Sequence, residues 1–108
     1  MSFSKEFLNI AKISGVDRYI FLDDQGNIAA HDIKNPQKAS EMFFSCNQNI
    51  RAISSNKFKY AIFSRKNKKN ILIFPVGNYS LGVIKQEGMD TLVLVDSISK
   101  FLNELMHK

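Results

Sequence analysis

The amino-acid sequence predicts an α/β fold: a single five-stranded, mostly antiparallel sheet between helices, in the order α-β-β-α-β-β-β-α. Stretches with strand-like alternation are separated by turn residues, and helical periodicity occurs at the start, in the middle and at the end of the chain. The predicted strands are also apolar on both alternating faces, as in 71–74, where Ile71 and Ile73 alternate with Leu72 and Phe74. A sheet of this kind has to be covered on both faces.

Length and composition indicate one folded domain over 1–108. The chain has 108 residues, of which 44% are hydrophobic and 23% charged, within the usual range for a globular domain. No apolar run reaches the roughly 18–20 residues that span a bilayer, and the N-terminus has no signal-peptide pattern, so we expect no membrane insertion. The single cysteine, Cys46, cannot form an internal disulfide. We therefore expect the reducing environment of the cytoplasm.

The first third predicts a helix followed by a hairpin. The helix covers 4–14, with Ser4 as its N-cap and Gly15 as its stop. Strands over 16–23 and 27–31 follow, joined by turn residues at 24–26. The apolar stripe of the helix consists of Phe7, Ile10, Ala11 and Ser14.

The rest of the chain predicts a long helix, three strands and a last helix. The long helix runs from Pro36 to about residue 56, and the strands cover 58–65, 70–76 and 79–86 as an antiparallel meander. Asp90 is placed to cap the last helix. Residues 92–95 also suit a short strand, which leaves the start of that helix open to within a turn. Its apolar face consists of Leu94, Val95, Ile98, Phe101, Leu102 and Leu105.

A search for nucleotide and metal motifs gives no candidate cofactor site. Gly77 and Gly82 have the spacing of a phosphate loop, but Val83 and Ile84 stand where Lys and Ser or Thr are required. We instead expect Gly77 in a two-residue turn and Gly82 at a strand position where another group packs closely. The segment 23–27 lacks the alternating oxygen ligands of a calcium loop, and we expect it to form a turn.

Catalytic residues are not indicated either. Cys46 lies on the apolar stripe of the long helix, which predicts a buried, unreactive thiol. His31 and His107 have no neighbouring ligand spacing or nucleophile. We therefore expect a protein without enzymatic activity, metal or cofactor.

Two segments resemble the Roadblock (dynein light chain) family. They are 15–26, where a helix leads into a hairpin with an Asp/Gly turn, and 73–81, where a Pro-Val-Gly corner joins the last two strands. The order of elements matches over almost the whole chain. The resemblance implies a homo- or heterodimer without a catalytic centre that binds a Ras-like small GTPase, a motor complex or a signalling scaffold. The related longin and profilin-like folds leave a sensor domain with a small-molecule pocket as an alternative.

Residue patterns and the resemblance together predict a homodimer. Three helices cover two apolar sheet faces, so the face under the single long helix is short of cover. Strand 58–65 is apolar on both faces and lacks proline, which makes an unpaired edge prone to aggregation. In the resembled family this strand pairs with its twin while the long helices pack side by side. The predicted interface consists of Ala39, Met42, Phe43, Cys46, Ile50, Ile53, Phe58, Tyr60 and Ile62.

Positive charge is concentrated in the middle of the chain. Residues 1–33 carry three basic and five acidic residues (−2), 34–69 carry nine and one (+8), and 70–108 carry three and four (−1). The basic patch consists of Lys57, Lys59, Arg65, Lys66, Lys68 and Lys69, interleaved with aromatic residues. It is typical of a solvated edge strand and turn. An acidic protein is the next candidate partner for it, and nucleic acid is less favoured because the aromatic residues are needed in the core.

Overall fold

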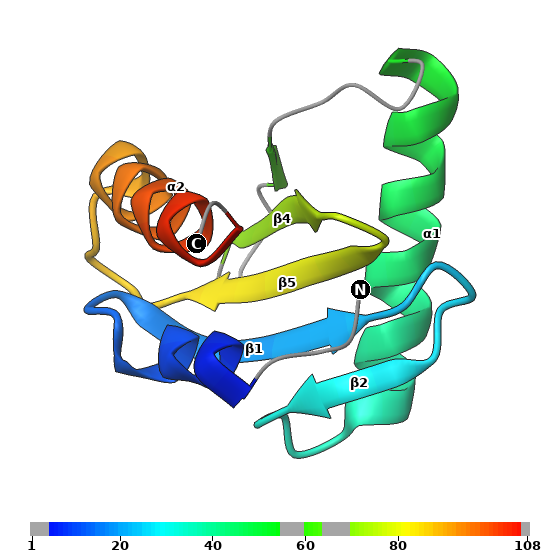
Figure 1. Cartoon of the computed structure of the whole chain (residues 1–108), viewed down its shortest axis with the longest axis horizontal. Coiled ribbons are helices and arrows are strands. Elements are labelled where there is room, and N and C mark those ends of the chain that lie inside the picture. Colours follow the sequence, from blue (N-terminus) through cyan, green and yellow to red (C-terminus); the bar gives the residue numbers. More distant parts are fainter. Residues whose placement is uncertain (1–4, 55–59, 64–69, 107–108) are drawn as a thin grey trace.

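The structure is a computed structural model that describes residues 5–54, 60–63 and 70–106, without the side chains of 46–54. Figure 1 shows its elements in chain order. They are η1 (Lys5–Lys12), β1 (Val16–Leu22), β2 (Ile28–His31), α1 (Pro36–Ser54), β3 (Ala61–Phe63), β4 (Ile71–Val76), β5 (Tyr79–Lys85) and α2 (Thr91–Met106). The predicted fold class and order of elements are confirmed, apart from the type of the first helix.

The five strands form one sheet in the order β2-β1-β5-β4-β3, and every neighbouring pair is antiparallel. The first hairpin and the last meander are joined through β1 and β5. Leu81 of β5, for example, faces Phe21 of β1 on one side and Phe74 of β4 on the other. β2 and β3 are therefore the two edges of the sheet.

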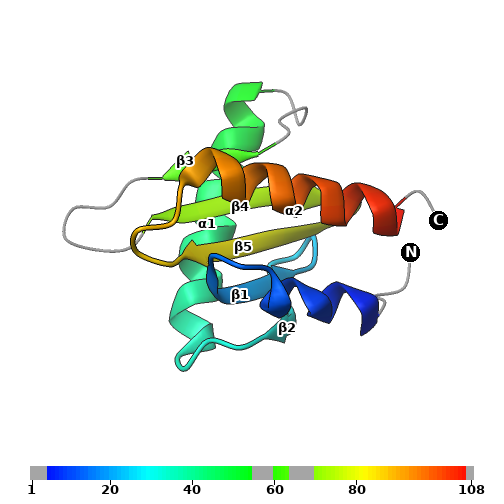
Figure 2. The same ribbon diagram turned by 90° about the vertical axis from the view of Figure 1, so that its left-hand side faces the viewer.

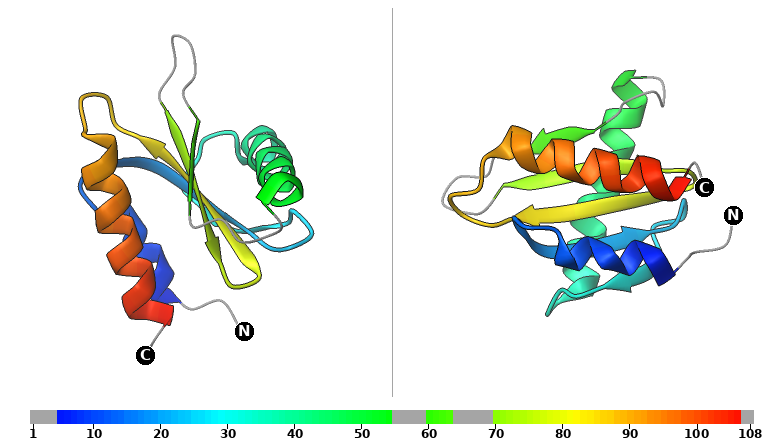
Figure 3. Two further views of the ribbon diagram at one scale, coloured as in Figure 1. Left: turned by 90° about the horizontal axis from the view of Figure 1, so that it is seen from above. Right: turned by 60° about the vertical axis from the view of Figure 1, so that its left-hand side comes forward.

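Helices cover both faces of the sheet, as its apolar pattern requires. η1 and α2 lie on one face and α1 lies on the other (Figures 2 and 3). The cluster under η1 and α2 includes Phe21, Phe74 and Ile98, whereas the cluster under α1 includes Ile20, Phe43 and Ile73. The alternation of side chains along each strand thus feeds two separate cores.

The first helix is a 3₁₀-helix, not the predicted α-helix. In a 3₁₀-helix residues three apart lie in line. Phe7 and Ile10 are buried, and Ile13 packs against the same cluster just beyond the helix. Ala11, which an α-helical period places on the same stripe, is exposed. The apolar residues that pack on the sheet from this segment therefore recur every three residues.

The predicted hairpin and its turn are confirmed. The Oδ1 of Asp23 accepts hydrogen bonds from the backbone amides of Gln25 (2.9 Å) and Asn27 (2.8 Å). Gly26 has a φ of 85°, a conformation that glycine adopts without strain. These local contacts reverse the chain between β1 and β2.

The last helix begins at Thr91, and Asp90 caps it as predicted. The Oδ1 of Asp90 accepts a hydrogen bond from the amide of Val93 at 3.0 Å. Residues 92–95 are therefore helical, and their alternative assignment as a strand is wrong. Leu94 and Ile98 are fully buried, so the face predicted from the spacing of apolar residues is the face that packs on the sheet.

Candidate interaction surface

Among the described residues β3 pairs with β4 only, so its other side is an edge of the sheet. The amide of Lys85 donates to the carbonyl of Asn70 at 3.0 Å, so Asn70, just before β4, and Lys85 of β5 are a hydrogen-bonded pair. Because hydrogen bonding alternates along an antiparallel strand, the odd-numbered residues of β4 direct their backbone groups to β3. Ile71 and Ile73 are in register with Phe63 and Ala61. The N–H and C=O of the residue between these two, Ile62, therefore point to the outer edge.

Pro75 agrees with this alternation. It lies within β4, where a proline ordinarily removes a ladder hydrogen bond. As an odd-numbered residue of β4, its nitrogen faces away from β5. The β4–β5 ladder thus loses no donor at this position.

The side chains of the edge strand are apolar on both faces. Tyr60 stacks on Phe74 with 6.2 Å between ring centroids, and Ile62 is in register with Leu72, so both lie on the face of η1 and α2. Their exposed fractions are 39% and 38%. Phe63 packs into the cluster under α1. Among the residues that the structure describes, none covers this apolar strand edge.

On α1, the structure corrects one residue of the predicted interface. Phe43 is 2% exposed and packs against the sheet of its own chain, so it is a core residue. Space for its ring comes from Gly82 on β5, which has no side chain. Ala39 and Met42 are half-buried at the margin of the same cluster. The side chains of Cys46, Ile50 and Ile53, and all of Phe58, lie outside the described residues.

The predicted basic patch cannot be placed, because each of its residues lies outside the described ranges: Lys57, Lys59, Arg65, Lys66, Lys68 and Lys69. They bracket β3 in the sequence and lie within the predicted strand 58–65 or no more than four residues from its ends. His107 also lies outside the described residues. His31 ends β2 and is exposed, with its Nδ1 3.1 Å from the carbonyl oxygen of Ile33.

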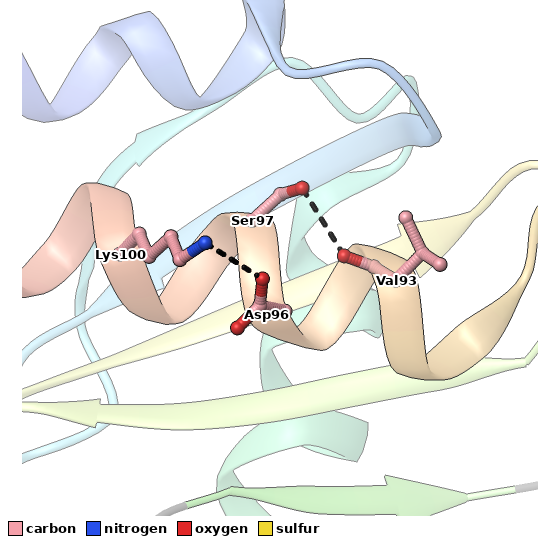
Figure 4. A network of polar contacts seen from close by, with 4 residues as sticks. All are labelled: Val93, Asp96, Ser97 and Lys100. Carbon is pink, nitrogen blue, oxygen red and sulfur yellow. Dashed lines mark hydrogen bonds and ion pairs between the residues drawn. The ribbon is translucent and has the colours of Figure 1, made fainter.

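The outer face of α2 carries polar contacts that belong to the helix itself (Figure 4). Lys100 forms an ion pair with Asp96 at 3.1 Å, and Ser97 Oγ donates to the carbonyl of Val93 at 3.1 Å. Both charged side chains are largely exposed, so the pair contributes little to stability.

Among the described residues, two ionisable groups have clearly shifted pKa values. Burial raises the pKa of the Tyr19 phenol, and the charge of Asp32 raises it further. The pKa of Asp23 is lowered, mainly because the backbone amide of Asn27 donates to its carboxylate. Asp32 also accepts a hydrogen bond from the backbone amide of Tyr19 at 2.7 Å, an interaction across the β1–β2 hairpin that sequence reasoning missed.

Within the described ranges, no three His, Cys, Asp or Glu side chains are grouped so that they could hold a metal ion. In the same part of the chain, no helix combines the length and apolar character needed to cross a membrane.

No protein-family model and no curated protein sequence matches the chain. Solved structures match it over nearly its whole length. MglB from Myxococcus xanthus is 15% identical, with a TM-score of 0.71 over 99% of this chain and 96% of that chain. The Roadblock/LC7 domain from Streptomyces avermitilis is 12% identical, with a TM-score of 0.69 over 89% and 87%. LokiProfilin2, solved in complex with rabbit actin, is 14% identical, with a TM-score of 0.64 over 97% and 98%. These similarities and the element order described above establish that the chain has the fold of Roadblock/LC7 domains, as the resemblance in its sequence predicts.

Proposed function

We propose that this protein is a non-catalytic, homodimeric interaction module of the cytoplasm that regulates or scaffolds a Ras-like small GTPase or a related assembly. The observation that carries the proposal is the apolar edge at β3, which no described residue covers, in a chain with the Roadblock/LC7 fold. The sequence resemblance implies dimerisation through this strand and recognition of a GTPase. The function would then be performed by surface recognition rather than by catalysis.

The β3 edge is suited to pairing with its own copy. A twofold axis at Ile62 would place the outward backbone groups of this residue opposite those of the partner's Ile62, giving a reciprocal hydrogen-bonded pair. Two five-stranded sheets would become continuous, and the α1 helices of both chains would lie on the same face. Ala39, Met42, Tyr60 and Ile62 are the described residues that we assign to the interface. A stable interface of this kind should bury more than about 1,000 Å² in total.

The test of the dimer is a proline at the outer edge. Replacing Ile62 by Pro removes the outward N–H but leaves the hydrogen bonds of Ala61 and Phe63 to β4, so we expect a folded monomer. His31→Pro is the matched control, because His31 lies on the opposite edge strand. The pair of His31 and Ile20 alternates with the hydrogen-bonded pairs of β1 and β2, so the N–H of His31 also points to an outer edge. Multi-angle light scattering at micromolar concentration should give a dimer for wild type and for His31→Pro. A monomeric wild-type protein would contradict the proposal.

The charge distribution favours an acidic partner. Residues 34–69 carry a net charge of +8, and a positive field of this kind accelerates association with negatively charged surfaces. Affinity purification followed by mass spectrometry should identify a candidate GTPase. Titration of that purified GTPase in its GDP and GTP forms then measures whether the module distinguishes the two states. Binding to RNA or DNA that weakens steeply with salt, without binding to any GTPase, would favour a nucleic-acid adaptor instead.

The sequence resemblance leaves a second candidate, a profilin-like sensor domain with a small-molecule pocket between sheet and helices, and LokiProfilin2 shares the fold. That profilin was solved in complex with actin, so the neighbour itself is an example of protein recognition on this fold. A thermal-shift screen of metabolites separates the two candidates. A sensor domain should be stabilised by a particular small molecule in proportion to its concentration, whereas an interaction module should respond to its protein partner.

A further inference from the structure

Two consecutive aromatic residues of α1 each pack on a glycine of the sheet layer. Atoms of the Phe43 ring lie 2.6, 2.7 and 2.8 Å from the position that a Cβ on Gly82 would occupy. Atoms of the Phe44 ring lie 3.0, 3.0 and 3.3 Å from the corresponding position on Gly26. Carbon atoms in ordinary contact are about 3.5–4.0 Å apart. A Cβ at position 82 would clash with the Phe43 ring, and a Cβ at position 26 would require the Phe44 ring to move by a few tenths of an ångström.

The two contacts hold α1 at separate points. Gly82 is in the central strand, in register with Ile20 on one side and Ile73 on the other, and both of these are buried. Gly26 is in the turn between β1 and β2, at one end of the sheet. α1 runs across the strands (Figure 1), so the pair of contacts fixes both its position and its rotation about its own axis.

Rotation is fixed because consecutive helical residues point about 100° apart. A rotation of α1 about its axis that moves one ring away from its glycine also moves the other ring relative to its own glycine. A rotation of 20° would displace side chains on the flank of a helix about 5–6 Å in radius by about 2 Å. A displacement of that size is large compared with the tolerance of a close-packed interface.

We propose that Phe43, Phe44, Gly82 and Gly26 are positioning residues for the dimer interface. They lie outside the interface, and they set the rotation at which α1 presents the flank that begins at Met42. This inference rests on the proposed function, since it concerns the dimer named there. Two aromatic–glycine contacts inside each chain thus determine which residues of α1 reach the partner.

The test compares glycine variants with matched backbones. Gly26 and Gly88 have φ angles of 85° and 81°, but nothing lies within 4 Å of a Cβ on Gly88. Gly26→Ala and Gly88→Ala therefore impose similar backbone strain, and only the first displaces a ring of α1. Sedimentation equilibrium should show the dimer dissociation constant raised at least tenfold in Gly26→Ala and changed less than twofold in Gly88→Ala. Unfolding by urea, measured alongside, reports the loss of stability in each.

Two further variants keep the inference falsifiable if a glycine variant fails to fold. Phe44→Leu removes the ring from Gly26 without backbone strain and should also weaken the dimer about tenfold. Gly82→Ala should weaken it, and the double variant Gly82→Ala with Phe43→Leu should recover at least part of the affinity because the smaller side chain makes room for the added Cβ. A dimeric wild type whose dissociation constant is unchanged in Gly26→Ala and Phe44→Leu would overturn the inference alone. A monomeric wild type would instead overturn the proposed dimer.

Discussion

Leu94 and Leu92 of α2 provide a matched pair for testing how α2 is held. They are the same residue type two positions apart on one helix, but Leu94 is 0% exposed and Leu92 is 68% exposed. We expect Leu94→Ala to lower the free energy of unfolding by about 3–4 kcal/mol. Three buried carbons at about 0.8 kcal/mol each contribute about 2.4 kcal/mol, and the remaining cavity adds the rest.

Leu92→Ala should lower the free energy of unfolding by no more than about 0.8 kcal/mol, roughly a third of the transfer contribution, because Leu92 is 68% exposed. The higher helix propensity of alanine offsets part of this loss. Urea unfolding followed by far-UV circular dichroism gives both values, at one protein concentration because a dimer is stabilised by mass action. A fall in the thermal midpoint of about 10–20 °C should accompany the Leu94 variant. Equal losses in the two variants would refute the reasoning, because they would place Leu92 in the core as well.

Two predictions concern the first hairpin. Asp32→Ala should destabilise the protein by about 1–3 kcal/mol, because it leaves the Tyr19 amide without its acceptor. Asp32→Asn keeps an oxygen and should destabilise the protein less. Asp24 is exposed, so Asp24→Ala should change the stability by no more than about 0.5 kcal/mol in the same urea assay. If Asp24→Ala costs as much as Asp32→Ala, the hydrogen bond is not the cause. Asp23 should titrate by NMR below its ordinary pKa of 3.8. Because the folded-state pKa is depressed, its contribution to stability is present above pH 3.8 and is lost as the pH falls through the folded value, so Asp23→Asn should flatten the acid side of the stability profile. A measured pKa at or above 3.8 would contradict this.

Local patterns in the sequence were sufficient for most elements. Pro36 at the start of α1 and Asp90 before α2 are end signals that depend only on neighbouring backbone groups. The turn at Asp23 likewise closes within five residues. The type of the first helix was harder to predict, because Phe7 and Ile10 fit a period of 3.0 residues per turn as well as one of 3.6. The two periods are distinguished only by the packing of Ile13 against the same cluster.

The candidate surface was predictable in outline and not in detail. An apolar strand without proline after the long helix indicated an edge, and β3 lies at an edge. Phe43 was placed in the interface because its spacing on the helix is the same as that of its neighbours. Whether such a residue faces its own sheet or a partner depends on what lies opposite, and Gly82 is 39 positions further along the chain.

The sequence by itself determined the number and order of the elements, the kind of each except the first helix, the need for cover on both faces of the sheet, and the absence of recognisable catalytic and metal motifs, because these follow from composition and from interactions within a few residues. Only the tertiary structure decided that β5 lies between β1 and β4, that Gly82 and Gly26 receive Phe43 and Phe44, and that Asp32 holds the Tyr19 amide. Each of these depends on groups distant in the chain that meet only when the sheet has formed. Local propensity carries no information about such long-range contacts, since the same glycine or aspartate is compatible with many turns and strands.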